Sequence, residues 1–373
     1  MDGTIVGSIG SDVSIEQISK HYGPVPAVEN VSFAARAAEF VSLLGPSGSG
    51  KTTLLMMIAG FEMPSAGMIR VGARDITHVP PNRRGVGMVF QKYALFPHMT
   101  VAQNIAFPLR MRKMDRQEIA RRVEAALSLV RLEGYGGRMP NQLSGGQQQR
   151  IAVARALVFE PPVLLMDEPL GALDKKLRGE MQIEIKSLQQ RLGVTVLYVT
   201  HDQEEALTMS DRVAVMSDGR LAQIGTPLEL YENPKTPFVA DFIGKMNFLQ
   251  GEYLGSDATA AIIRLPGATR LSARSLNGSA DRFTAGKAVK VAIRPERLKL
   301  SSRGAGGPEA VPATVETAIF VGSFHVILVR VAGVEDPIHV QLPAAGAGVA
   351  LRAGEEVDLL VERDAIHLFP AEV

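Results

Sequence analysis

A glycine-rich run has the residue types and spacing that bind phosphate. Glycines let backbone N–H groups turn toward phosphate oxygens, and a helix that begins at the run adds partial positive charge. The Lys51 ammonium can pair with the terminal phosphates, and the Thr52 hydroxyl can bind Mg²⁺. The run matches the P-loop pattern, so it predicts a site for ATP and Mg²⁺ rather than an ordinary turn. Its members, with the residue that follows, are Gly45, Pro46, Ser47, Gly48, Ser49, Gly50, Lys51, Thr52 and Thr53.

Two carboxylates follow an apolar stretch at residues 163–166. In P-loop ATPases an Asp at the end of such a strand holds Mg²⁺, which predicts Asp167 as a metal ligand. A second carboxylate directly after it, Glu168, suits a general base for water. By itself the pair could be two solvated charges at a strand end. Beside a P-loop it predicts the chemistry of hydrolysis.

A second run suited to phosphate lies before a helix-like stretch at residues 148–159. Ser144 can cap that helix, and the two glycines after it leave backbone N–H groups uncovered. One nucleotide does not need both runs within the same subunit. The members of this signature segment are Leu143, Ser144, Gly145, Gly146 and Gln147.

With the signature segment the sequence resembles the ABC ATPase family, whose signature reads LSGGQ. In that family the signature closes over ATP bound to a partner, so the resemblance implies a head-to-tail dimer of two copies of the chain. It further implies that Gln91 reaches Mg²⁺ and water, that Asp174 belongs to a D-loop (residues 172–174), and that His201 is a switch histidine that contacts the γ-phosphate. Glu168 and His201 would be the catalytic residues, and Thr52, Gln91 and Asp167 the metal ligands.

Tyr22 matches the aromatic residue that stacks on adenine in this family. An aromatic side chain at this position could equally pack within an amino-terminal sheet. Both interpretations stay open from the sequence.

Within the family the chain is most similar to ATPases of solute importers. Residues 91–98, 231–234, 238–244 and 293–296 carry this likeness. It implies a separate integral membrane permease as partner, indirectly a solute-binding protein, and a peripheral position at the cytoplasmic face of the inner membrane. A polyamine-like solute is favoured, with iron, sugar and phosphonate as alternatives. Two other classes stay open: a non-transport ABC ATPase, and a nucleotide kinase, which would not need the signature segment.

The elements that position these residues belong to an α/β P-loop fold with a RecA-like core. A strand at Phe40–Leu44 leads into the P-loop, and a helix at residues 52–59 leaves it and ends at Gly60. A helical subdomain is expected at about residues 92–160. There Asp115 and Glu118 form a capping-box pattern, followed by one apolar face. That face consists of Ile119, Val123, Leu127 and Val130.

The carboxy-terminal third changes to short alternating strands such as Phe324–Val331, which predicts an all-β, OB-like domain. We expect a loose amino terminus at 1–13, an ABC ATPase domain at 14–244 and the β domain at 245–373. A helix should start at Thr226 and Pro227.

Composition limits the classes of function. The formal net charge is +1, which gives no global electrostatic reason to expect nucleic acid or an anionic membrane surface as the main partner. There are no cysteines, so disulfides and thiolate metal sites are excluded. No apolar stretch approaches the ~20 residues of a membrane helix, and we expect no secretion signal.

Overall fold

The computed structural model describes residues 9–256, 260–266, 269–273, 283–307, 309–344 and 351–371. By its contacts the chain divides into two compact units, Met1–Leu230 and Tyr231–Val373, and each is described by itself. The domain limits expected from the sequence stay a prediction. Residues 1–8 of the expected loose terminus lie outside the described residues, and the first strand begins at Val13.

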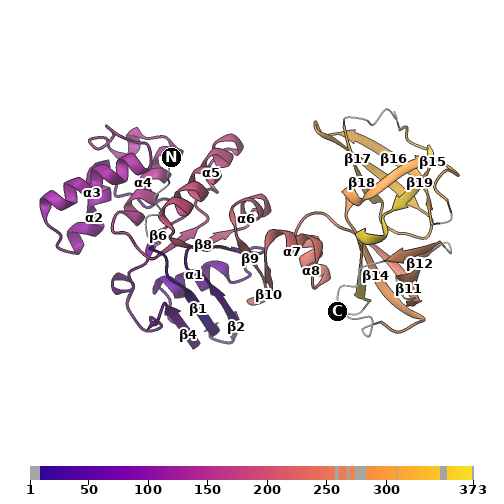
Figure 1. Ribbon diagram of the computed structural model, residues 1–373, viewed down its shortest axis with the longest axis horizontal. Coiled ribbons are helices and arrows are strands. Elements are labelled where there is room, and N and C mark those ends of the chain that lie inside the picture. Colours follow the sequence, from indigo (N-terminus) through magenta and orange to yellow (C-terminus); the bar gives the residue numbers. More distant parts are fainter. Residues whose placement is uncertain are drawn as a thin grey trace, which may run out of the picture. The chain divides into compact units, whose positions relative to one another are not determined.

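The first unit is built on a six-stranded sheet with the order β10-β9-β3-β8-β7-β6 (Figure 1). Neighbouring strands from β9 to β6 run parallel, and only β10 is antiparallel. In such a sheet the carboxyl ends of the strands meet at one edge, where ligands bind. The strands are β3 (Phe40–Leu44), β6 (Gly87–Val89), β7 (Val163–Asp167), β8 (Thr195–Thr200), β9 (Arg212–Ser217) and β10 (Arg220–Gly225).

A second, antiparallel sheet covers helix α1 (Lys51–Ala59), which starts at the P-loop and ends at Gly60. Leu54, Leu55 and Ile58 of this helix are fully buried and share one core with both sheets, as expected for a helix that is apolar all round. On the other side of the six-stranded sheet lie α5 (Lys175–Leu192) and α6 (Gln203–Met209). The second sheet has the order β2-β1-β4-β5, with β1 (Val13–Tyr22), β2 (Val25–Ala35), β4 (Ala66–Val71) and β5 (Arg74–Asp75).

Helices between β6 and β7 form the expected helical subdomain: α2 (Val101–Met111), α3 (Arg116–Leu129) and α4 (Gly145–Leu157). Asp115 caps α3, because its carboxylate accepts the N–H groups of residues 117 and 118. The prediction of a full capping box at this helix start is wrong. The Glu118 carboxylate binds Arg121 and Arg122 instead of turning back to the cap, since two guanidinium groups outcompete one backbone N–H. The predicted apolar face is confirmed by the core.

The second unit contains two five-stranded antiparallel sheets that share one core, which confirms the all-β prediction. Their orders are β13-β12-β11-β14-β20 and β15-β19-β16-β17-β18. Short helix α7 (Pro227–Glu232) starts as predicted, and α8 (Pro237–Phe242) follows it. The strands are β11 (Asn247–Ser256), β12 (Ala261–Arg264), β13 (Arg270–Ala273), β14 (Lys287–Ile293), β15 (Leu298–Ser302), β16 (Val311–Phe320), β17 (Phe324–Val331), β18 (Ile338–Pro343), β19 (Glu356–Val361) and β20 (Ile366–Pro370).

Arg294 attaches the segment that enters the second unit to its sheets. The side chain is 2% exposed and donates to the carbonyl oxygens of Tyr231, Ala240 and Lys245 at 3.1, 3.1 and 3.3 Å. Its guanidinium also lies 4.0 Å from the centre of the Tyr231 ring. Residues 231–245 are therefore held to the β unit. Within the described part of the chain, no helix has the length and apolar character needed to cross a bilayer.

Candidate functional site

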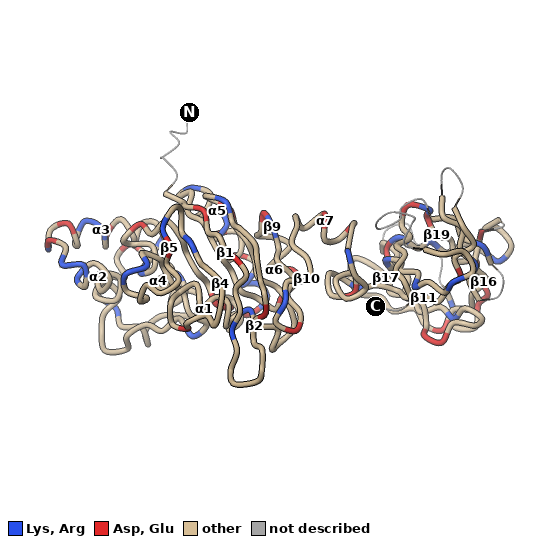
Figure 2. Tube along the Cα trace, turned by 90° about the horizontal axis from the view of Figure 1, so that it is seen from below, with Lys and Arg blue, Asp and Glu red and all other residues tan. Residues whose placement is uncertain are grey.

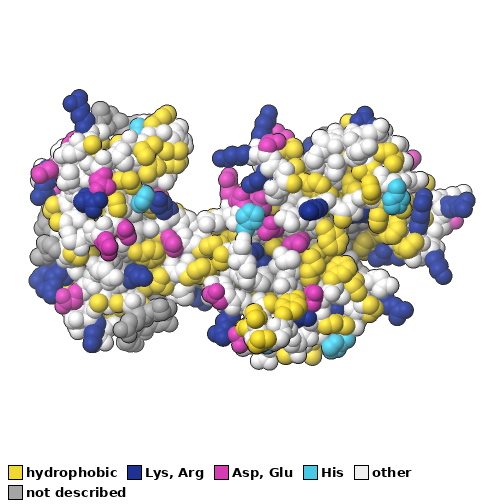
Figure 3. Space-filling view, turned by 180° about the vertical axis from the view of Figure 1, so that it is seen from behind, with side chains coloured by type: hydrophobic (Ala, Val, Ile, Leu, Met, Phe, Trp, Pro, Cys, Tyr) yellow, Lys and Arg dark blue, Asp and Glu magenta, His cyan; other side chains and the backbone are white. Residues whose placement is uncertain are grey.

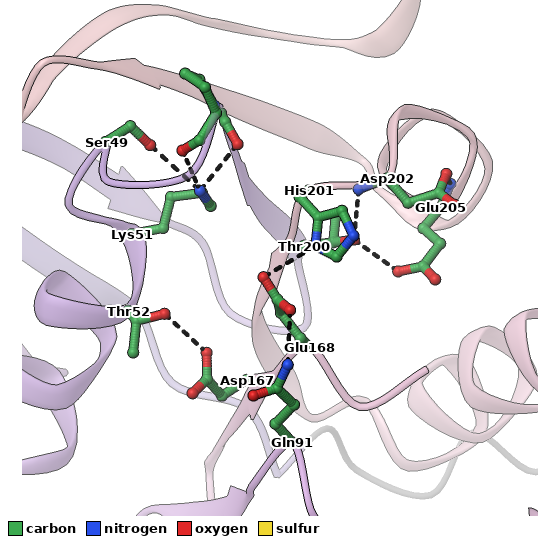
Figure 4. A network of polar contacts seen from close by, with 12 residues as sticks. Ser49, Lys51, Thr52, Gln91, Asp167, Glu168, Thr200, His201, Asp202 and Glu205 are labelled. Carbon is green, nitrogen blue, oxygen red and sulfur yellow. Dashed lines mark hydrogen bonds and ion pairs between the residues drawn. The ribbon is translucent and has the colours of Figure 1, made fainter. Parts of the chain in front are cut away.

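The P-loop folds around the ammonium of Lys51 (Figure 4). Its Nζ atom donates to the carbonyl oxygens of Gly45 and Pro46 at 2.9 and 2.8 Å, and to the Ser49 hydroxyl at 3.3 Å. Burial lowers the pKa of Lys51, and the nearby carboxylates of Glu168 and Asp167 oppose that shift. All of its hydrogen-bond acceptors are neutral, so anionic oxygens would be stronger partners for this cation than the groups that it contacts.

Two glycines of the P-loop permit close approach of the backbone. A Cβ atom at Gly45 would lie 2.3 Å from the carbonyl oxygen of Met216. At Gly50 it would lie 2.4 Å from that of Ala27, and this residue has φ of +91°. Neither position can take a side chain without moving the backbone, so the glycines at these points are required by packing as well as by flexibility.

Asp167 and Thr52 form a pair of hard oxygen donors. The Thr52 hydroxyl donates to Asp167 Oδ1 at 3.2 Å, and Asp167 is 9% exposed. Burial raises the pKa of Asp167, with a smaller contribution from the charge of Glu168. Oxygen donors of this kind fit Mg²⁺. The described residues contain no cluster of three or more His, Asp or Glu that could enclose a metal. Such a site suits Mg²⁺ that arrives with phosphates, since this ion keeps few protein ligands.

Glu168 connects three strand ends, as Figure 4 shows. Its Oε2 atom accepts from Gln91 Nε2 at 3.0 Å, and its Oε1 atom lies 3.0 Å from His201 Nδ1. The backbone of Glu168 has φ of 42°, a left-handed conformation that costs energy in a residue with a side chain. The carboxylate and the histidine are 21% and 61% exposed, so water can reach them. The structure thus brings Lys51 together with five other predicted residues at the edge of the parallel sheet: Thr52, Gln91, Asp167, Glu168 and His201.

The segment after Gln91 is fixed from α4. Tyr93 and Ala94 have φ of 59° and 48°. The guanidinium of Arg155, which is 9% exposed, donates to the carbonyl oxygens of both residues at 2.9 and 2.8 Å. Arg155 therefore compensates for a strained turn beside the site. Sequence reasoning did not identify this residue.

Sequence reasoning also did not identify the buried polar residues that lie next to the His201 loop. Glu205 is 2% exposed, and its carboxylate accepts the hydroxyl groups of Tyr198 and Thr200, both at 2.7 Å. Burial raises the pKa of Glu205, while these two hydrogen bonds oppose the shift. Asp202 caps α6 by accepting the N–H of Glu205 at 3.2 Å. The spacing of an acidic residue and a Glu three positions later could have predicted the cap at Asp202. The buried contacts of Glu205 could not have been predicted from the sequence.

The signature segment forms a separate surface on the subunit. Ser144 caps α4 through a capping box with Gln147, as its position predicted. Ser144 and Gly145 are exposed, and Leu143 is buried. A Cβ atom at Gly146 would lie 3.0 Å from the Leu177 side chain of α5. Among the described residues, no hydrogen bond or ion pair joins this segment to the P-loop.

Two further predicted residues lie apart from the cluster around Glu168. Asp174 caps α5, because its carboxylate accepts the N–H of Leu177 at 2.9 Å. Tyr22 is 50% exposed at the end of β1, where the ammonium of Lys20 lies 4.9 Å from the centre of its ring. It is thus available to a planar ligand, and its contact with adenine stays a prediction.

Comparisons with known proteins cover both units. Residues 28–171 match the ABC transporter family and residues 291–369 match the TOBE domain. The chain is 50% identical over 356 residues to the spermidine/putrescine import ATP-binding protein PotA of Rubrobacter xylanophilus, covering 95% of this chain and 92% of that protein. It is 51% identical over 320 residues to PotA 1 of Pseudomonas aeruginosa, covering 83% and 85%.

Solved structures give the same likeness for the first unit. A dimeric structure of MJ0796, a bacterial ABC transporter cassette, has a TM-score of 0.52 and 34% identity, covering 57% of this chain and 98% of that chain. A dimeric post-hydrolysis state of that cassette with ADP and Pi has a TM-score of 0.51 and 33% identity, with the same coverage.

Proposed function

Because this chain belongs to the ABC transporter family, as the ATP-hydrolysing subunit of an importer, we propose that it drives uptake of a polyamine such as spermidine or putrescine. The observation that carries the proposal is the 50% identity over 95% of the chain to a protein named for the import of these solutes. The likeness extends through the β unit and is not confined to the motifs that every ABC ATPase shares. Iron, sugar and phosphonate are the alternative solutes.

We propose that two copies face each other head to tail, with each ATP between the P-loop of one copy and the signature segment of the other. The exposed Ser144 and Gly145 support this arrangement, because their helix end is open to a ligand from outside the subunit. The dimeric form of the related cassettes supports it as well. The D-loop, with Asp174, would lie beside the second copy.

The contacts of the site residues support the roles that we propose for them. Lys51 exchanges its neutral acceptors for the phosphate oxygens of ATP. Thr52, Asp167 and Gln91 would hold Mg²⁺, which when bound neutralises charge on the phosphates. Glu168 accepts the proton of the attacking water, and the hydrogen bonds from Gln91 and His201 keep its carboxylate at the edge of the sheet. His201, with its exposed ring, contacts the γ-phosphate.

An apolar groove on the first unit is the proposed docking site for the permease. It has a volume of about 530 Å³ and lies where residues 94–96 meet α2 and α4. Phe96, Phe107 and Phe159 line it, and Met111 at its rim is 65% exposed. Apolar side chains are prominent on this unit in Figure 3. A short amphipathic helix of a permease would cover them, and Arg155 would connect such contact to the turn that follows Gln91.

The turn between α2 and α3 is basic (Figure 2). Arg112 and Lys113 lie in the turn with Asp115, Arg110 lies in the last turn of α2, and Arg116 is the first residue of α3. Positive charge beside an apolar docking groove suits a peripheral position at the cytoplasmic face of the inner membrane, whose lipids are partly anionic. The solute-binding protein would act on this chain only indirectly, through the permease.

Uptake measurements in cells that lack this gene test the proposed solute. Cells that regain the parent chain should regain uptake of labelled spermidine or putrescine, and cells given the Lys51→Ala chain should not. Iron, a sugar and a phosphonate are measured in parallel. Restored uptake of one of these solutes without polyamine uptake would identify the solute as that one. Unchanged uptake of all of them would favour an ABC ATPase outside transport.

A further inference from the structure

Arg178, in the first turn of α5, contacts two loops that the proposed mechanism uses separately. Its NH2 group donates to the carbonyl oxygen of Leu173, in the D-loop, at 3.1 Å. Its NH1 group donates to Asp202 Oδ2 at 2.9 Å, and its Nε atom lies 3.7 Å from Glu205 Oε1. One planar guanidinium therefore spans from the D-loop to the residue that follows His201.

The loop that carries His201 is fixed by the same two acidic residues. The Asp202 backbone N–H donates to the Thr200 hydroxyl at 3.0 Å, and that hydroxyl donates to Glu205 at 2.7 Å (Figure 4). Thr200 and Asp202 are the neighbours of His201 on either side. A movement of Asp202 or Glu205 would therefore change where the His201 ring lies against Glu168.

The Nε atom of Arg178 and Oε1 of Glu205 are too far apart for a hydrogen bond. The pair therefore has two possible arrangements, one without this hydrogen bond and one with it. The Nε–H group of Arg178 is buried, and it has no hydrogen-bond partner among the residues that the structure describes. A hydrogen bond would need an approach of about 0.8 Å, from 3.7 Å to the usual 2.9 Å. The Glu205 carboxylate is 2% exposed, so water cannot readily replace the missing donor. A small shift of the D-loop and the first turn of α5 could complete the pair.

We propose that Arg178 is a positioning residue that transmits the position of the D-loop to His201. The proposal rests on the function given above, in which the D-loop lies beside the second copy and His201 contacts the γ-phosphate. Joining of the two copies displaces Leu173. The Arg178 guanidinium follows the carbonyl oxygen of Leu173 and comes within hydrogen-bond distance of Glu205. This moves the His201 loop to the position in which the His201 ring contacts the γ-phosphate. Each subunit would thus hydrolyse ATP only when its partner is engaged.

The test combines steady-state kinetics with the nitrogen resonances of ¹⁵N-labelled histidine, in which His201→Gln identifies the His201 signals. Arg178→Ala should lower kcat at least tenfold, leave the KM for ATP within twofold, and shift the His201 signals. Arg178→Lys should regain part of kcat, since one ammonium can reach one of the three acceptors. Lys186→Ala is the matched control, because Lys186 also lies on α5 and pairs with Asp211 at 2.8 Å. It should change neither readout.

Parental kcat in Arg178→Ala, or His201 signals that do not move, would overturn the proposal. Circular dichroism checks that each variant is folded. If Arg178→Ala is not, Glu205→Gln takes its place, because it removes the charge that faces Arg178 and keeps the shape. Should His201→Gln itself hydrolyse ATP at the parental rate, the role given to His201 under the proposed function fails. In that case the His201 resonances by themselves test whether Arg178 connects the D-loop to His201.

Discussion

The Oε1 atom of Glu168 lies 3.0 Å from Nδ1 of His201, so a carboxylate and an imidazole share one side of the site. Either group could take a proton from water. Glu168 is the less exposed of the two, and it also accepts a hydrogen bond from Gln91. We therefore expect the carboxylate to be the base and the histidine its neighbour, and the distinction can be measured.

Glu168→Gln should slow ATP hydrolysis by about 10²–10⁴-fold, the usual contribution of a general base. The amide keeps the shape of the side chain but cannot take a proton. Lys51, Thr52 and Asp167 are unchanged, so ATP and Mg²⁺ should still bind and a dimer that contains unhydrolysed ATP should accumulate. Size-exclusion chromatography followed by assay of the bound nucleotide measures this. Hydrolysis near the parental rate would make His201 the candidate base.

Asp167→Asn should have a different defect, although it changes the adjacent residue. A neutral amide is a poorer ligand for a hard cation than a carboxylate. The affinity for ATP in the presence of Mg²⁺ should fall at least roughly tenfold, a loss of about 1.4 kcal/mol. With EDTA the parent and the variant should bind ATP alike. An affinity for ATP with Mg²⁺ equal to that of the parent would rule out Asp167 as a ligand.

Lys51→Ala should weaken ATP binding by about 10–100-fold, because hydrogen bonds to charged groups contribute about 1.5–3 kcal/mol. The loss should appear both with and without Mg²⁺, in contrast to Asp167→Asn. Equilibrium titration with a fluorescent ATP analogue measures it, and Lys186→Ala serves as the lysine control. The P-loop assignment would be wrong if Lys51→Ala bound the analogue as the parent does.

Ser144→Arg should abolish hydrolysis while the isolated subunit keeps its affinity for ATP. The exposed cap of α4 accepts a large side chain without disturbing the P-loop, but it then blocks the nucleotide of the second copy. We expect a loss of at least about 100-fold in kcat, the scale of a misplaced reacting group. Titration at concentrations where sizing shows only monomer gives the affinity. Equal loss of monomer affinity would mean that the signature segment acts within its own subunit.

Asp358 provides a pH-dependent test of the β unit. It is 3% exposed and binds Arg303 and the N–H groups of Gly304 and Gly306. The hydrogen bond from Arg303 is the main reason that the pKa of Asp358 is lowered. Because the folded state favours the charged form, this stabilisation is present above the ordinary pKa. It is lost as the pH falls through the lowered one.

Asp358→Asn should therefore unfold at a lower urea concentration than the parent at neutral pH. The difference should shrink as the pH falls below the ordinary pKa of an Asp side chain, about 4, and through the lowered pKa of Asp358. Glu356→Gln is the control, since Glu356 lies 3.9 Å from the same arginine but is 72% exposed and should contribute little. A difference between parent and Asp358→Asn that does not change with pH would exclude the charge as its cause.

Residues carried by motifs of fixed spacing could be predicted from the sequence together with their strands. Asp167, Gln91 and His201 each follow an apolar run, and parallel strands bring such positions to one edge. The residues that hold them could not be predicted. Arg155 and Arg178 contact carbonyl oxygens and carboxylates that are remote in sequence, and no local pattern identifies an acceptor that only tertiary packing supplies. The choice of Glu118 between a backbone cap and two arginines likewise depended on competition among neighbours.

The hydrogen bonds from Arg294 to residues 231–245 also decide where the chain can be divided for expression of its parts. A fragment that ended at Gly244 would take α8 with it and separate Ala240 from Ala292 and Phe369, its packing partners in the β unit. The remaining fragment would keep the Arg294 guanidinium but lose two of its three carbonyl acceptors, those of Tyr231 and Ala240, at a cost of several kcal/mol. A cut just before Tyr231 leaves these contacts intact. An exchanged β unit should therefore begin at or before Tyr231, whereas a protease site at this point would interrupt α7 beside the buried Leu230.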